Sequence, residues 1–236
     1  MSVVASNVYS QTRPTPALER VDLGEIPYQE AMGQMERWVA DRRDGKAGDR
    51  LFLLNHPAVI TYGRRTEPGD LPSASDIPVL EVDRGGYATY HGPGQLVGYL
   101  VVSARDRGPG GVVRWVERSL IEGLGELGFD LIRRETPPGA SSLVGVWTRD
   151  GRKVCSIGMR IRAGITSHGF AVNIDPDMAA FRSFTVCGLP DVEMTSLRQL
   201  AAEAGRPAPS ERDVRDAIAR AAGALTAEAL AAPTAS

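Results

Sequence analysis

Two thiols and one lysine are the side chains in this sequence best suited to covalent acyl chemistry. Cys187 follows the stretch FRSFTV and precedes Gly-Leu-Pro, so it lies where a regular element breaks. Cys155 lies inside KVCSIGMRI, two residues after Lys153. A positive charge within a few Å of a thiol favours the thiolate, the form that attacks thioesters. Lys153 beside either sulfur would therefore create a nucleophile, whereas each cysteine alone reads as a small packed residue.

The stretch that carries Lys153 is predicted to be a β-strand. Side chains of a strand alternate between its two faces, so Lys153, Cys155 and Ile157 are expected to share one face. The ordinary alternative for Lys153 is a surface position at the end of the hairpin that the preceding Asp-Gly turn indicates. The pattern alone leaves open which thiol, if either, meets the lysine.

Residues 83–102, DRGGYATYHGPGQLVGYLVV, combine many glycines with polar side chains between two apolar stretches. Glycine lets a backbone approach a neighbour that a Cβ would repel, and in a strand it marks a bulge or a close approach. Arg84, His91 and Gln95 can add side-chain donors to exposed backbone N–H groups. The segment predicts a ligand-contacting backbone, with a tight hairpin as the alternative. It fits no phosphate-loop or dinucleotide pattern, because no helix begins directly after the glycines.

The three histidines, His56, His91 and His168, each lie beside residues that break regular structure. Their positions suit loops, which carry function more often than core strands do. None of them shows the spacing of paired metal ligands. No metal site is predicted.

Composition excludes several classes of protein. The 236 residues carry a formal net charge of −2, which gives no electrostatic support for nucleic-acid binding. No run reaches the roughly 18 apolar residues of a membrane span, and the N-terminus lacks the pattern of a signal peptide. Two cysteines do not make a disulfide framework, so a cytoplasmic location is expected.

Hydrophobic periodicity predicts a mixture of helices and hairpin-linked strands. Helical spacing occurs over 26–45 and 110–129, and capping boxes open two further helices at Ser196 and Ser210. Strands are expected over 50–63, 96–102 and 144–174. The order predicts a single α+β domain with a mixed, largely antiparallel sheet flanked by helices. Residues 1–20 are interpreted as a flexible leader, 21–208 as the catalytic domain and 209–236 as a C-terminal helix and tail.

Taken together, the stretches RGGYATYHGPGQLVGYLVV, GRKVCSIGMRIRAGITSHGFAVNID and FRSFTVCGL, with NHPAVITYGRR before them, resemble the lipoyl(octanoyl) transferases. The resemblance covers about residues 50–200 in the expected order. It implies the fold shared with lipoate and biotin protein ligases. It further implies that an octanoyl group moves from acyl carrier protein to a lysine of a lipoyl domain, with Cys187 as the nucleophile, Lys153 as its activating partner and no cofactor.

The resemblance also implies acyl-binding positions in three short segments. These are Arg84, Gly85, Gly86, Tyr87, Ala88, Thr89, Tyr90 and His91, then Ser156, Ile157 and Gly158, then Gly169, Phe170 and Ala171. Leu96, Met159 and Val172 are candidates for the wall of an acyl pocket, or ordinary core residues. The sequence departs from the family at Val186, where proline is common, and at Cys155, which stands where a small apolar residue is expected.

Implied partners are acyl carrier protein as donor, and as acceptors the lipoyl domains of 2-oxoacid dehydrogenase complexes and the glycine cleavage H protein. Arg42/Arg43 and Arg64/Arg65 could contact an acidic carrier protein or simply form a solvated face. Three alternatives stay open: an ATP-dependent lipoate or biotin ligase, a cysteine hydrolase with His91 or His168 as base, and a binding module for acylated proteins or lipoyl domains.

Overall fold

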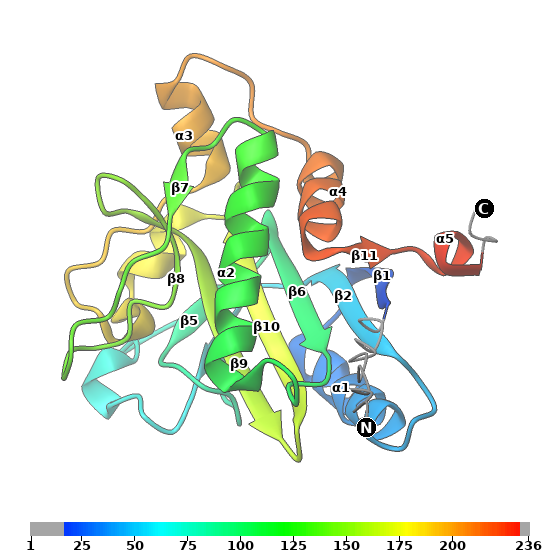
Figure 1. Ribbon diagram of the computed structural model, residues 1–236. Helices are drawn as coiled ribbons and strands as arrows, with labels where there is room; N and C mark the ends of the chain where they lie inside the picture. The colour runs from blue at the N-terminus through cyan, green and yellow to red at the C-terminus, as the bar shows by residue number, and fades with distance from the viewer. Residues whose placement is uncertain (1–16, 232–236) are drawn as a thin grey trace, which may run out of the picture.

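The computed structural model describes residues 17–231 (Figure 1). The strands are β1 (Leu18–Glu25), β2 (Asp49–Asn55), β3 (Val59–Tyr62), β4 (Val79–Glu81), β5 (Thr89–His91), β6 (Gln95–Val101), β7 (Leu131–Ile132), β8 (Gly145–Thr148), β9 (Lys153–Arg162), β10 (Ile165–Asn173) and β11 (Ala224–Leu225). The α-helices are α1 (Tyr28–Arg43), α2 (Gly108–Glu126), α3 (Leu197–Glu203), α4 (Glu211–Ala222) and α5 (Ala227–Ala231). Short 3-10 helices are η1 (Pro68–Asp70), η2 (Met178–Arg182) and η3 (Val186–Gly188).

A large mixed sheet runs through the molecule in the order β11-β1-β2-β6-β10-β9-β8-β7. From β2 to β7 every neighbouring pair is antiparallel, while β1 pairs in parallel with both β2 and β11. Its two faces carry different residues because strand side chains alternate. This sheet is the mixed, largely antiparallel one that the sequence predicted.

Helices cover the two faces of the sheet separately. Val116, Leu120 and Leu124 of α2 pack with residues of α3 and α4 over one face (Figure 1). Ala31 and Met35 of α1 pack over the other face. Each helix therefore follows the apolar spacing seen in its sequence. Both predicted capping boxes are present, at the N-termini of α3 and α4.

A second, three-stranded sheet in the order β4-β3-β5 lies beside the first. Its core packs Ile60 of β3 and Tyr90 of β5 against Phe181 of η2 and Val186 of η3. This packing anchors the segment that carries Cys187. The small sheet thus fixes one wall of the region between the two sheets.

The ends of the described chain belong to the same packed unit. β1 begins at Leu18, inside the range 1–20 interpreted as a leader, and residues 1–16 lie outside the described part. At the other end, α4 packs against α2 and β11 pairs with β1, so residues 211–225 contribute to the main core and sheet. The interpreted tail, 231–236, falls almost wholly outside the described residues.

Candidate active site

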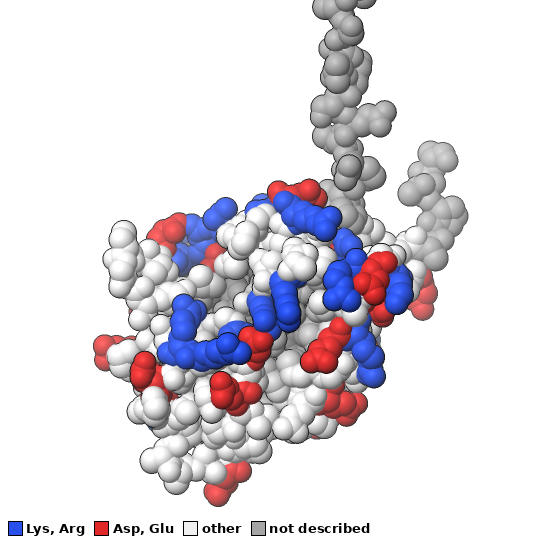
Figure 2. All heavy atoms as spheres, turned by 90° about the horizontal axis from the view of Figure 1, so that it is seen from below, with Lys and Arg blue, Asp and Glu red and all other residues white. Residues whose placement is uncertain are grey.

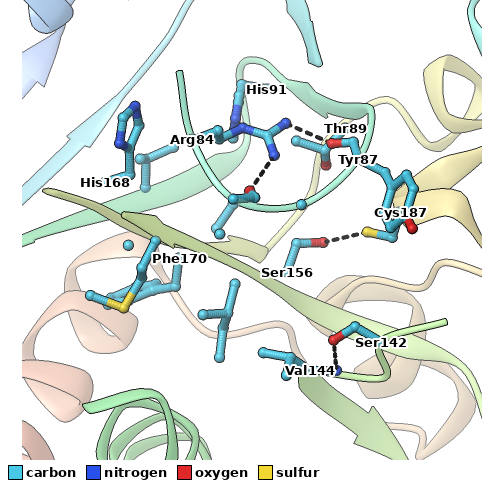
Figure 3. A pocket seen from close by; sticks show the side chains of 18 of the residues that line it. Arg84, Tyr87, Thr89, His91, Ser142, Val144, Ser156, His168, Phe170 and Cys187 are labelled. Carbon is cyan, nitrogen blue, oxygen red and sulfur yellow. Dashed lines mark hydrogen bonds between the residues drawn. The ribbon is translucent and has the colours of Figure 1, made fainter. Parts of the chain in front are cut away.

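A pocket beside the two sheets is lined by Cys187, Lys153 and most residues of the segment 84–91. Figure 3 shows Cys187 and Arg84 at this pocket. Its volume of about 260 Å³ lies just below the roughly 300 Å³ at which pockets for drug-sized ligands begin. Apolar side chains in its lining are Tyr28, Val97, Tyr99, Val113, Val144, Ile157, Met159, Phe170 and Ala171. The pocket suits a small, largely apolar ligand.

Cys187 Sγ lies 3.4 Å from Lys153 Nζ at the wall of this pocket. On its other side it lies 3.7 Å from Ser156 Oγ (Figure 3). The Cys187 side chain is half-buried, so it is reachable from the cavity. An ammonium at this distance stabilises a thiolate by direct electrostatic attraction. The geometry makes Cys187 a nucleophile candidate with a proton donor and acceptor beside it.

Lys153 reaches the pocket because a β-bulge interrupts β9. Trp147 of β8 is opposite Lys153, but its neighbour Val146 is opposite Cys155, which leaves Val154 as an extra residue. The extra residue turns Lys153 to the face that carries Ser156. The prediction that Lys153 shares a face with Cys155 and Ile157 is therefore wrong. Regular alternation holds only up to the bulge.

Lys153 is buried beside the Cys187 sulfur, and its charge also acts on the carboxyl group of Glu117. The side chain is only 2% exposed, and Nζ lies 5.0 Å from the centre of the Trp147 ring. Among residues 17–231 no carboxylate forms a salt bridge with it. A glycine at 145 makes room, because a Cβ there would come within 2.6 Å of Lys153 Cε. A buried ammonium requires compensation, and the Cys187 sulfur and the Glu117 carboxyl group are the neighbours in position to provide it.

Cys187 occupies a strained turn that aims its side chain at the lysine. Its φ of 58° lies in the left-handed region, inside η3. The preceding Val186 is buried against the small sheet, so apolar packing holds the turn where proline is common in the family. The Cys187 N–H donates to the carbonyl oxygen of Ala88 at 2.9 Å. This N–H group is therefore already paired and is not a free donor for an oxyanion.

The glycine-rich segment is held around the guanidinium of Arg84, which is buried. Nη2 donates to the Thr61 carbonyl oxygen and hydroxyl and to the Tyr87 carbonyl oxygen, each at 2.9 Å. Burial lowers the pKa of Arg84. Gly85, the next residue, has no room for a side chain, because a Cβ there would lie 2.7 Å from the Met159 carbonyl oxygen. The loop requires a glycine at this position because its backbone passes directly over β9.

Aromatic and imidazole rings form the inner part of the pocket. The ring of Tyr28 stacks on His91 with centroids 5.9 Å apart, and Tyr99 lies edge-on to His168. Burial lowers the pKa of His91 to about 3 and that of His168 to about 4, with Arg84 contributing to both. Burial also raises the pKa of Tyr28 to about 12. All of these groups are uncharged at neutral pH.

The tautomer of His91 follows from its neighbours. Gln95 donates through Nε2 to Asn173 Oδ1 at 2.9 Å, so its Oε1 faces His91 Nδ1 at 2.8 Å. Nδ1 is therefore the protonated nitrogen. No histidine among the described residues forms a hydrogen bond with Cys187 Sγ, and this geometry gives no support to a histidine base for the thiol.

Most of the predicted acyl-binding positions surround this one pocket. The lining contains Arg84, Gly85, Gly86, Tyr87, Thr89, His91, Ser156, Ile157, Gly158, Gly169, Phe170 and Ala171. Ala88 and Tyr90 are the exceptions. Alternation along β5 turns Tyr90 into the core of the small sheet, and Ala88, just before β5, is fully buried. Of the three proposed wall residues Met159 lines the pocket, whereas Leu96 and Val172 belong to the core beneath α2.

Several lining residues were missed by sequence reasoning. Tyr28 begins α1, Tyr99 lies mid-strand in β6, and Ser142 and Val144 come from the loop before β8. Tyr28 was interpreted only as part of the apolar stripe of α1. An aromatic residue in the first turn of a helix is only a weak sequence signal for a pocket residue, because such residues usually belong to the core. The contact between the Tyr28 and His56 rings is seen only in the structure.

Cys155 lies on the opposite face of β9 and is fully buried in the core beneath α2. Burial raises the pKa of its thiol far above the ordinary value. The described residues contain no cluster of three or more potential metal ligands. None of the helices in 17–231 combines the length and apolar character needed to cross a bilayer.

Comparison with known proteins places this geometry in context. The family model described as lipoyl protein ligase A/B catalytic domain matches residues 27–223. Among curated proteins, the octanoyltransferase of Frankia casuarinae is 45% identical over 203 residues, covering 83% of this chain and 90% of that protein. The octanoyltransferase of Mycobacterium sp. (strain KMS) is 42% identical over 217 residues, covering 92% and 87% of the two chains.

Solved structures with the same fold are more distant in sequence. The bipartite lipoate protein ligase of Thermoplasma acidophilum has a TM-score of 0.63 at 17% identity, covering 86% of this chain and 81% of that one. A lipoate-protein ligase A bound with ATP has a TM-score of 0.62 at 16% identity, covering 86% and 82%. These likenesses confirm the predicted fold.

Proposed function

Because this chain belongs to the lipoyl protein ligase A/B catalytic domain family, we propose that it is an octanoyltransferase acting through a thioester on Cys187. The observation that carries the proposal is the 3.4 Å approach of Lys153 Nζ to Cys187 Sγ beside a largely apolar pocket. Its curated relatives at 41–45% identity are octanoyltransferases. The ligase structures share the fold at much lower identity, which favours acyl transfer over ATP-dependent ligation.

The first half-reaction loads the enzyme. The Cys187 thiolate attacks the carbonyl carbon of the octanoyl thioester on acyl carrier protein, and a new carbon–sulfur bond forms to Sγ. The bond between that carbon and the carrier sulfur breaks. The Lys153 ammonium then protonates the departing carrier thiolate, which leaves a neutral Lys153 amine. The octanoyl chain lies against the apolar part of the lining.

The second half-reaction delivers the acyl group to an acceptor lysine. The neutral amine of the acceptor attacks the thioester carbon, and Lys153 takes the proton that the nitrogen loses. The carbon–sulfur bond to Cys187 breaks, which restores the thiolate beside an ammonium. The same lysine thus acts first as general acid and then as general base. Atoms and charge balance without a cofactor.

The acceptors in this proposal are lipoyl domains, such as those of 2-oxoacid dehydrogenase complexes and the glycine cleavage H protein. The related Thermoplasma ligase was solved in a study that included its E2 lipoyl domain. Free thiols at Cys155 and Cys187 suit the reducing conditions of the cytoplasm, where we place the reaction.

The proposal is tested by following the acyl group by intact mass. Octanoyl-acyl carrier protein is mixed with the protein, and an octanoyl adduct removable by hydroxylamine is expected. Addition of a lipoyl domain should discharge the adduct and modify the domain lysine. Cys187→Ser should give no hydroxylamine-labile adduct, while Cys155→Ser should still give one.

Three outcomes would contradict the proposal. An adduct that depends on Cys155 would move the chemistry to the other thiol. Product formed only with free octanoate and ATP would indicate a ligase. Discharge to water at the same rate with and without the lipoyl domain would indicate a hydrolase.

A further inference from the structure

An arginine-lined depression continues from the catalytic pocket across the outside of α2. A second hollow shares Val113, Val144 and Met159 with the pocket. A third hollow shares Arg114 and Arg133 with the second. The three hollows are therefore neighbours, and the innermost contains Cys187. We call the outer two hollows the arginine groove.

The arginine groove is positively charged although the chain as a whole is not. Its lining contains five arginines and three glutamates, while the formal net charge of the chain is −2. The arginines are Arg107, Arg114, Arg118, Arg133 and Arg134, all exposed. On the face seen from below, basic side chains gather in several clusters with acidic side chains between them (Figure 2).

Part of this charge has no acidic partner. Glu122 pairs with Arg118 and Glu135 with Arg133. Within residues 17–231 no salt bridge involves Arg107, Arg114 or Arg134. Two of these three arginines lie over aromatic rings instead: Arg107 over Trp115 at 4.8 Å and Arg134 over Trp147 at 5.0 Å. Stacking holds the guanidinium groups in place and leaves their charge available to a partner.

Glu117, the third glutamate, lies beneath the groove surface, where the charges of Arg133 and Arg114 act on it. It is buried, and its Oε1 accepts a hydrogen bond from the Gly145 N–H at 3.1 Å. That contact ties α2 to the start of β8, next to the glycine that makes room for Lys153. The exposed part of the groove is therefore dominated by arginine.

We propose that the arginine groove is the docking surface for the acyl donor, an acidic carrier protein whose thioester-bearing arm follows the groove into the pocket. The proposal rests on the proposed function, since it assumes a protein-borne thioester. Charge complementarity and the position of the groove next to the pocket that holds Cys187 favour the donor. Two other basic clusters were considered from sequence. In the first, Arg42 forms a salt bridge with Asp49 and Arg43 one with Asp44, so both charges already have acidic partners. In the second, Arg65 lines the pocket and lies over the Tyr87 ring.

The two half-reactions separate the donor from the acceptor. Rates of acylation are measured for wild type, Arg114→Glu and the double variant Arg114→Glu/Arg133→Glu, with octanoyl-carrier protein and with octanoyl-N-acetylcysteamine, a small uncharged thioester. Discharge of the acylated enzymes to a lipoyl domain is measured separately. Arg37→Glu, an exposed arginine on α1 on the opposite side of the sheet, is the matched control.

Charge reversal at Arg114 should slow acylation by the carrier protein about tenfold at low salt, because charges at an interface rim act on association rate. The double variant should lose more, and the difference from wild type should shrink at high salt. Acylation by the small thioester and discharge to the lipoyl domain should be unchanged, as should every rate in Arg37→Glu.

Slower discharge to the lipoyl domain with unchanged loading would assign the groove to the acceptor and overturn the proposal. Equal loading of all variants by the carrier protein would also overturn it. A wild type that neither thioester acylates would contradict the proposed function itself, which keeps the two failures apart. Unchanged thermal unfolding of the variants shows that lost rate is not lost fold.

Discussion

The two thiol sites of this protein lie on opposite sides of one strand and have opposite chemical character. Cys155 is fully buried among apolar residues beneath α2, and burial raises the pKa of its thiol. Cys187 lies on a strained turn at the pocket, 3.4 Å from an ammonium. The same side chain is a packing element in one place and a nucleophile candidate in the other. The difference is made by neighbours distant in sequence.

Lys153 is close to one thiol in sequence and close to the other in space. It is two residues from Cys155 in sequence, yet its amine reaches Cys187, thirty-four residues away. The bulge at Val154 is what sends it there. The chain contains only two lysines, and the other, Lys46, is exposed. One extra residue in a strand therefore decides which sulfur lies beside the lysine amine.

Selective alkylation tests the contrast between the thiols most directly. Iodoacetamide should modify Cys187 in the native protein at least about 10³-fold faster than Cys155, because Cys187 is accessible from the pocket whereas Cys155 is fully buried with a raised thiol pKa. The sites are identified by peptide mass. After unfolding in guanidinium the two rates should converge. Comparable native rates would abolish the distinction.

Replacement of Lys153 should sharpen the assignment of roles. Lys153→Met keeps an apolar stem against Trp147 but removes the charge and the proton, so octanoyl transfer should fall by about 10²–10⁴-fold. Alkylation of Cys187 should then require a higher pH. The rate of octanoyl transfer to the lipoyl domain and the pH dependence of Cys187 alkylation measure the two effects. Lys46→Met, at the exposed lysine, is the control and should change neither.

Lys153→Arg separates charge from proton transfer at the same position. An arginine retains the cation but does not give up its proton in proteins. Alkylation of Cys187 should therefore stay closer to wild type than in Lys153→Met, while transfer to the lipoyl domain stays low. Full transfer activity in Lys153→Arg would exclude the acid–base role.

Gly85→Ala tests whether the loop over β9 tolerates a side chain at position 85. The added Cβ would lie 2.7 Å from the Met159 carbonyl oxygen, so the loop around Arg84 must shift. We expect a loss of about 1–3 kcal/mol in the free energy of unfolding, as for other overpacked sites, together with slower acylation. Gly69→Ala, where nothing lies within 4 Å of the new Cβ, is the control. Urea unfolding of both variants is the measurement.

The inner part of the pocket should make stability depend on pH. The folded-state pKa values of His91 and His168, about 3 and 4, lie below the unfolded value of about 6.5. Below pH 6.5 the unfolded chain binds more protons, so the free energy of unfolding should fall with decreasing pH. The slope is up to about 1.4 kcal/mol per pH unit for each histidine.

His168→Asn offers a direct check of that slope. His168 has a φ of 60°, which asparagine tolerates better than most residues. Urea unfolding between pH 5 and 7 should show a shallower pH dependence in the variant than in wild type. An unchanged slope would mean that His168 is not held neutral by the fold.

Local sequence predicted much of the fold. The apolar spacing of α1 and α2 and the capping boxes of α3 and α4 act within a few residues of each other, so they are readable before folding. The hairpin-linked strands predicted a largely antiparallel sheet for the same reason. The small sheet and the pairing of β11 with β1 join segments that are far apart in the sequence. No local sequence pattern predicts such pairings.

By itself the sequence determined which chemistry is available: two thiols, a lysine, a glycine-rich segment with an arginine, and motifs that resemble a known family. Only the tertiary structure decided that Lys153 meets Cys187 and not Cys155, that Ala88 and Tyr90 turn away from the pocket, and that Tyr28 and Tyr99 line it. The reason is physical. Reactivity depends on burial and on charges within a few Å, and those distances are set by packing between residues far apart in the chain.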